Sequence, residues 1–183
     1  MSAAPVAGRA SASRSEYTRA VLALGSNLGE RAETLAEAVS DLVDRPEVRL
    51  VDVSPVVQTK AVGGPEGQPD FLNMVMIVLT SLSPYELLAH CQAIEAKHHR
   101  TREVRWGPRT LDIDIITYNK LSQDDPLLTL PHPRASERAF VLYPWLLIDP
   151  TAVLEGHPIV ELLEDCADAD GVEGYDLLDE GQP

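Results

Sequence analysis

Residues 70–81 read DFLNMVMIVLTS, a near-continuous apolar run with the length of one β-strand. The preceding segment, 48–59, is rich in Val and Leu and contains Pro55, which indicates a strand that is bulged or lies at a sheet edge. The loop between the two, AVGGPEGQP (61–69), is rich in Gly and Pro. We therefore expect the two segments to pair as antiparallel strands across this loop.

Upstream of this pair the sequence predicts one strand and one helix. The run RAVLAL (19–24) is short and apolar and precedes Gly25-Ser26-Asn27, which is typical of a strand that ends in a tight turn. Apolar residues then recur at helical spacing from Leu35 to Val43, and Pro46 ends the pattern. We expect residues 25–27 to shape the turn and cap the helix rather than to contact a substrate.

Downstream, the sequence predicts a second helix and a fourth strand. Ser83-Pro84-Tyr85-Glu86 has the residues of a capping box with proline in the first turn, and the helix should run to about Lys97. The segment TLDIDIITY (110–118) begins with the alternation of a strand. The resulting order predicts an α+β protein: a ferredoxin-like βαββαβ sandwich, an antiparallel sheet with helices on one face, plus a C-terminal extension.

The length and composition indicate one domain with two tails. The chain has 183 residues, of which 44% are apolar, enough for one hydrophobic core. Residues 1–18 are predicted to be a disordered N-terminal tail, although their Ala, Ser and Arg content loosely resembles a transit peptide. Residues 19–160 would form the domain, and 161–183 an acidic C-terminal tail.

The charge and the cysteines limit the partners and the compartment. A net charge of -14 argues against binding of nucleic acid or of an anionic membrane, and no apolar run has the length of a membrane span. Cys91 and Cys166 are too few for a disulfide framework. We therefore expect a reducing compartment, which we take to be the cytoplasm. We also expect, without a specific signal in the sequence, a monomer that acts on small-molecule substrates.

Asp112 and Asp114 form the first chemical signal. They are two residues apart on the predicted strand, so both carboxylates project from one face. Two carboxylates roughly 5 Å apart repel by about 3 kcal/mol at an effective dielectric of about 20, a cost that a divalent cation would more than offset. Carboxylates without His or Cys beside them favour Mg²⁺ over zinc. The alternative is an exposed strand face with two solvated acids.

A group of cations precedes this acidic pair in the sequence: Lys97, Arg100, Arg102, Arg105 and Arg109. Guanidinium groups suit phosphate oxygens, and a Gly-Pro turn leads from the group to the acids. Mg²⁺ and several arginines are sufficient to position the groups and neutralise the developing charge in phosphoryl-type transfer. The alternatives are a solvated loop paired with the acidic tail and, for Trp106, core packing.

The run RWGPRTLDIDI (105–115) resembles the signature of the 6-hydroxymethyl-7,8-dihydropterin pyrophosphokinases, which are folate-pathway enzymes. Other motifs of that family follow the same order in this chain: ALGSNLG (23–29), PDFLN (69–73), QAIE (92–95), LPHPR (130–134) and RAFVL (138–142). The resemblance covers roughly residues 20 to 150. It implies that the hydroxymethyl oxygen of the pterin attacks the β-phosphorus of ATP, giving AMP and the pterin pyrophosphate.

The resemblance also implies roles for individual residues. Asp112 and Asp114 would bind two Mg²⁺ ions, and Arg100 and Arg109 would contact phosphates and stabilise the transferring group. The ATP side would be lined by Gln92, Glu95, Arg102, Trp106, Arg109, His132 and Arg138. The pterin would lie between Phe71 and Phe140, with Asn73 and the backbone near Thr59 and Val62 contacting its polar edge.

Less specific interpretations remain for these residues and for the protein. Phe71 and Phe140 could be core residues, His132 a turn residue, and Gln92 with Glu95 a solvated helix face. The chain could instead be a ferredoxin-like module that senses a nucleotide or metal, or another Mg-dependent nucleotidyl or phosphoryl transferase with a different acceptor.

Overall fold

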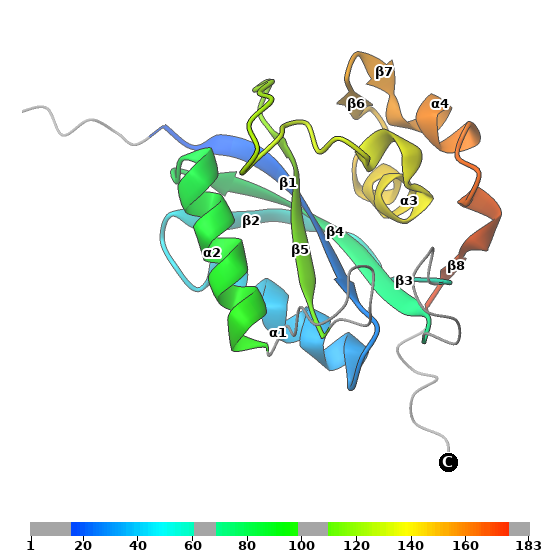
Figure 1. Cartoon of the computed structure of the whole chain (residues 1–183), viewed down its shortest axis with the longest axis horizontal. Helices are drawn as coiled ribbons and strands as arrows, with labels where there is room; N and C mark the ends of the chain where they lie inside the picture. The colour runs from blue at the N-terminus through cyan, green and yellow to red at the C-terminus, as the bar shows by residue number, and fades with distance from the viewer. Residues whose placement is uncertain (1–15, 61–68, 99–109, 176–183) are drawn as a thin grey trace, which may run out of the picture.

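The computed structural model describes residues 16–60, 69–98 and 110–175. In these ranges the chain forms a six-stranded sheet and a separate two-stranded ribbon, with helices packed around the sheet (Figure 1). The elements are β1 (Thr18–Ser26), α1 (Arg31–Val43), β2 (Val48–Val53), β3 (Val57–Thr59), β4 (Phe71–Thr80), α2 (Pro84–Lys97), β5 (Asp112–Tyr118), α3 (Ala139–Ile148), β6 (Val153–Leu154), β7 (His157–Pro158), α4 (Ile159–Glu164) and β8 (Val172–Gly174). Short 3-10 turns precede α3 and β8.

The sheet is antiparallel, with β1 and β4 at its centre. Its order is β5-β1-β4-β3-β8, and β2 also pairs with β4. β2 and β3 both pair with β4 across the 61–69 loop, as the sequence predicts. Pro55 lies between β2 and β3, where the chain leaves the strand conformation. The neighbouring Ser54 hydroxyl still bonds to β4, because it accepts a hydrogen bond from the Val75 N–H at 2.9 Å. The α+β class with an antiparallel sheet is therefore confirmed.

Helices cover both faces of the sheet, so the expectation of helices on one face was wrong. On one face α1 and α2 pack on Leu22, Leu24 and their neighbours, while on the other α3 packs on Val21, Val75 and Ile77. The cause is β4, whose successive side chains are apolar and buried on both faces. The apolar side chains on the face away from α1 and α2 must also be buried, and α3 in the C-terminal part of the chain buries them.

The start of α2 follows the sequence prediction. The Ser83 hydroxyl accepts from the Glu86 N–H, the Glu86 carboxylate accepts from the Ser83 N–H at 2.8 Å, and Pro84 is in the first turn. This capping box satisfies amides that would otherwise lack partners at the helix start. The helix ends at Lys97, as expected.

The turn after β1 differs from the prediction. β1 continues through Gly25 to Ser26, and the Asn27 side chain donates to the Pro69 carbonyl at 3.3 Å instead of capping α1. The residue before α1 is Glu30, which makes no side-chain cap. Gly25 is thus a strand residue in the middle of the sheet, because it pairs with both β4 and β5.

Part of the predicted acidic tail belongs to the folded structure. α4 lies beside α3, and β8 pairs antiparallel with β3 at one end of the sheet (Figure 1). The domain boundaries 1–18, 19–160 and 161–183 remain predictions. No helix among the residues that the structure describes is both long and apolar enough to span a membrane.

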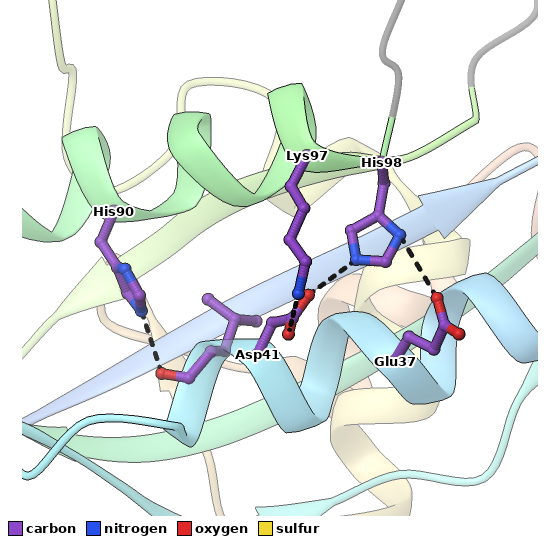
Figure 2. A network of polar contacts seen from close by, with 6 residues as sticks. Glu37, Asp41, His90, Lys97 and His98 are labelled. Carbon is purple, nitrogen blue, oxygen red and sulfur yellow. Dashed lines mark hydrogen bonds and ion pairs between the residues drawn. The ribbon is translucent and has the colours of Figure 1, made fainter.

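A polar network joins α1 to the end of α2 (Figure 2). Asp41 accepts from the Lys97 ammonium at 2.6 Å and lies 2.9 Å from Nε2 of His98, whose Nδ1 lies 3.7 Å from Glu37. His90 bonds the Leu42 carbonyl at 3.0 Å. The bonds from Lys97 and then His98 hold the pKa of Asp41 below its usual value.

Asp41→Asn should lower the melting temperature by roughly 2–4 °C at neutral pH. Because folding lowers the pKa of Asp41, its contribution to stability is complete above roughly pH 5 and disappears as the pH falls through the lowered value. Thermal unfolding followed by circular dichroism from pH 7 to pH 3 measures this. The exposed Asp44→Asn is the control, and a difference that persists unchanged at pH 3 would contradict the charge-based explanation.

Candidate active site

The Asp112 and Asp114 side chains lie on the face of the sheet that α3 covers. In the pairing with β1, Asp112 is opposite Gly25 and Asp114 is opposite Ala23. Ile113 and Ile115, the alternate residues of β5, belong to the core on the opposite face. Both carboxylates are half-buried. Strand alternation therefore points the two acids in one direction, as the sequence predicts.

Glu95 holds the strand that carries these acids. β5 is the edge strand of the sheet, and the Ile113 N–H donates to the Glu95 carboxylate of α2 at 2.8 Å. Glu95 is only 3% exposed, whereas Gln92 is exposed on the same helix. The burial of Glu95 rules out a solvated helix face for that residue, whereas Gln92 is exposed and its role on the ATP side stays a prediction. The buried carboxylate binds the amide between Asp112 and Asp114.

Two side chains from the segment before α3 reach Asp114. Arg138 Nη1 lies 3.5 Å and His132 Nε2 lies 3.7 Å from the Asp114 Oδ2. The Arg134 N–H donates to Nδ1 of His132 at 3.2 Å, so the proton of the neutral ring lies on Nε2 and faces the carboxylate. Burial lowers the pKa of His132, an effect that Asp114 opposes and Arg138 reinforces.

The predicted pterin residues lie farther along the same face. The Asn73 amide donates to the Thr59 hydroxyl at 2.8 Å, and both side chains are buried. Asn73 is opposite Gly25, which is opposite Asp112, so strand pairing puts the amide and the acid in one row across the sheet. Gly25, which has no side chain, is the residue between Asn73 and Asp112 in that row.

The two predicted stacking rings are both half-buried and belong to this face. Phe71 begins β4 two residues before Asn73 and pairs with Thr59. Phe140 lies in the first turn of α3, and the guanidinium of Arg138 is 5.5 Å from the centre of its ring. The structure thus brings Thr59, Phe71, Asn73, Asp112, Asp114, His132, Arg138 and Phe140 to one face.

Among the described residues, one predicted ATP-side residue lies away from this face. Gln92 is exposed on α2, which packs on the opposite face of the sheet. Val62, Arg100, Arg102, Trp106 and Arg109 lie outside the described residues. Their predicted roles stay predictions.

Gly25 is a site residue that sequence reasoning missed. A Cβ atom built there would lie 3.0 Å from Asn73 Oδ1 and 3.8 Å from a ring carbon of Phe71. Glycine inside a strand often marks a close approach of another group, and this signal was available. The sequence prediction instead placed residues 25–27 in a turn, whereas β1 continues through Ser26.

Comparisons with known proteins identify the family of this chain. Residues 21–150 match the family described as 7,8-dihydro-6-hydroxymethylpterin-pyrophosphokinase. The chain is 48% identical over 125 residues to the 2-amino-4-hydroxy-6-hydroxymethyldihydropteridine pyrophosphokinase of Bacillus subtilis, with 68% of this chain and 74% of that one covered. A protein of the same name from Pseudomonas aeruginosa is 44% identical over 149 residues, which are 81% of this chain and 91% of that one.

Solved structures support the fold. An HPPK-DHPS in complex with substrates superposes with a TM-score of 0.63 at 13% identity, covering 82% of this chain and 43% of that chain. A Plasmodium falciparum HPPK-DHPS with pteroate gives 0.62 at 15% identity, covering 84% and 44%. The chain therefore spans less than half of each of these solved chains.

The α+β fold presents paired carboxylates beside an arginine, with two aromatic rings on the same face, an arrangement suited to a transferase that uses a phosphorylated co-substrate and a flat ring. The chain belongs to the 7,8-dihydro-6-hydroxymethylpterin-pyrophosphokinase family. Its reaction is pyrophosphoryl transfer to a hydroxymethyl-dihydropterin in folate biosynthesis.

Gly25→Ala should raise the KM for hydroxymethyl-dihydropterin by roughly fivefold to tenfold, because the new methyl group must displace the Asn73 amide. The control is Gly171→Ala, where an added Cβ meets nothing within 4 Å. Steady-state assays at saturating ATP measure both variants. A folded Gly25→Ala enzyme with an unchanged KM would remove Asn73 from the pterin site.

Proposed function

We propose that this chain transfers the pyrophosphoryl group of ATP to 6-hydroxymethyl-7,8-dihydropterin with Mg²⁺ held by Asp112 and Asp114. The observation that carries the proposal is the shared face, on which Asp112 lies in line with Asn73 and Asp114 lies 3.5 Å from Arg138. The hydroxymethyl oxygen forms a bond to the β-phosphorus and the bond from that phosphorus to the α-phosphate oxygen breaks. AMP leaves, and the hydroxyl proton passes to solvent.

The two aspartates fit Mg²⁺ in the presence of a triphosphate. Mg²⁺ in nucleotide sites is commonly held by one or two carboxylates, with water and phosphate oxygens completing the octahedron. The Asp114 side chain is 36% exposed, so a nucleotide-bound cation can reach it from solvent. Bound there, two Mg²⁺ ions would neutralise triphosphate charge and lower the pKa of the attacking alcohol.

Residues of this chain would orient ATP. Arg138 is close enough to Asp114 to contact a phosphate that approaches the acids, and the neutral His132 offers its Nε2 proton beside it. Glu95 would act chiefly by fixing β5 through the Ile113 amide, next to the ATP side. We retain Arg100 and Arg109 as phosphate ligands, and Gln92, Arg102 and Trp106 as residues of the ATP side.

The pterin would lie next to Asn73. Thr59 accepts one proton of the Asn73 amide, which fixes the side chain and leaves its second N–H and its oxygen for the polar edge of the ring. Phe71 and Phe140 supply apolar ring faces on the same side of the sheet. Val62 is retained as a backbone contact.

One assay separates this reaction from its alternatives. The protein is incubated with ATP, Mg²⁺ and hydroxymethyl-dihydropterin, and the nucleotide products are resolved by chromatography. AMP is expected. ADP would indicate single phosphoryl transfer by a different transferase, and no nucleotide product would favour a binding module.

Asp112→Asn and Asp114→Asn should each reduce kcat by about a thousandfold or more while the fold survives, because each removes a charge from the proposed metal site. Asp124→Asn, at an exposed aspartate after β5, is the matched control. Circular dichroism verifies folding and the AMP assay gives kcat. Near-normal turnover in both site variants would remove the metal role.

Arg100→Ala should lower kcat far more than it raises the dissociation constant for ATP, since the contact with the transferring group strengthens as charge develops. Single-turnover kinetics combined with ATP titration separates the two effects. A change confined to the dissociation constant would make Arg100 a ground-state anchor only.

Three further assignments remain proposals. They are the ferredoxin-like topology of the β1–β5 core, a cytoplasmic location and a monomeric state. The strand order β5-β1-β4-β2 supports the first, since it places β4 between the two strands that α1 connects.

A further inference from the structure

The segment 159–175 lies beyond the family match, which ends at residue 150. It nevertheless contacts two elements that carry predicted pterin residues. α4 and the turn after it lie against α3, which carries Phe140, and β8 lies against β3, which ends at Thr59 (Figure 1). The two contacts involve different residues of the segment.

The first contact is at the start of α3. The Asp168 carboxylate accepts from the Ala139 N–H at 3.1 Å, and Ala139 stands between Arg138 and Phe140. The residue before the helix makes no side-chain cap of its own. A carboxylate at this position satisfies a helix amide and interacts favourably with the helix dipole. The Cys166 thiol donates to the Ser136 carbonyl at 3.7 Å, so the segment holds the chain on both sides of Arg138.

The second contact is along β3. Thr59 is opposite Val172, and the Tyr175 N–H donates to the Val56 carbonyl at 3.2 Å. β3 has only three residues and its other edge pairs with β4 at Phe71 and Asn73. β8 therefore turns a short edge strand into an internal one, which restricts the backbone that carries Thr59.

We propose that the segment 159–175 is a positioning element of the pterin site, with Asp168 as its positioning residue. Asp168 fixes the first turn of α3 and hence the Phe140 ring, while β8 fixes β3 and hence the Thr59 hydroxyl that orients Asn73. The inference rests on the proposed function, because Phe140, Thr59 and Asn73 are pterin contacts only if that function is correct.

The test compares Asp168→Ala with the conservative Asp168→Asn, whose amide oxygen still accepts from Ala139. Asp170→Ala, an exposed aspartate of the same turn, is the matched control. For each variant the dissociation constant of hydroxymethyl-dihydropterin is measured by fluorescence titration, and KM and kcat by AMP formation at saturating ATP. Circular dichroism and assays well below the melting temperature exclude unfolding.

Asp168→Ala is expected to weaken pterin binding and raise the pterin KM by about fivefold, with kcat changed less than twofold. Asp168→Asn should restore both values to within about twofold, and Asp170→Ala should match the wild type. Unchanged binding in Asp168→Ala, or Asp168→Asn as defective as Asp168→Ala, overturns the role of Asp168.

Should Asp168→Ala fail to fold, Glu173→Pro decides the question through β8. Antiparallel pairing repeats every two residues, so the Glu173 amide faces β3 as the Tyr175 amide does, and proline removes that donor. A pterin dissociation constant unchanged by Glu173→Pro would then overturn the proposal. Wild-type protein that binds the pterin but forms no AMP would refute the proposed reaction and leave the binding comparison valid.

Discussion

The pairing of β1 with β4 on one edge and with β5 on the other is the constraint on which the site depends. It sets Asn73, Gly25 and Asp112 in one row, and it places Asp114 one step away on the same face. A register shift of one residue in β5 would turn both acids into the aliphatic core under α1 and α2. The buried Ile113 and Ile115 oppose such a shift, and so the hydrophobic core fixes the position of the polar site.

Arg138 brings a positive charge to the paired acids, and hydrogen bonds support the backbone around them. Arg138 and His132 approach Asp114 from a segment that is distant in sequence, and Glu95 satisfies an amide of the edge strand between the two acids. Glu95 is an acid that is buried with a hydrogen-bond partner, whereas Asp112 and Asp114 keep partial access to solvent. This difference in burial separates the carboxylate that supports the strand from the two that we propose as metal ligands.

The helix α3, which covers the second face of the sheet, connects the hydrophobic core with the candidate site. α3 buries Trp145 and Val141 against β1 and β4, which places its first turn, with Phe140, beside the acids. The same helix is held from outside by α4 and by the Asp168 carboxylate. Packing that completes the core therefore also sets the position of an aromatic ring at the site.

The sequence by itself determined the features that depend on local periodicity and local hydrogen bonds. The strand at β4, the break at Pro55, the capping box of α2 and the common direction of Asp112 and Asp114 all follow from residues within a few positions of one another. Motif resemblance gave the family. Only the tertiary structure decided the burial of Glu95, the close approach of Gly25 to Asn73, the helices on the second face and the addition of β8 to the sheet. Each of these arises from contacts between residues far apart in the chain, whose energies local patterns do not contain.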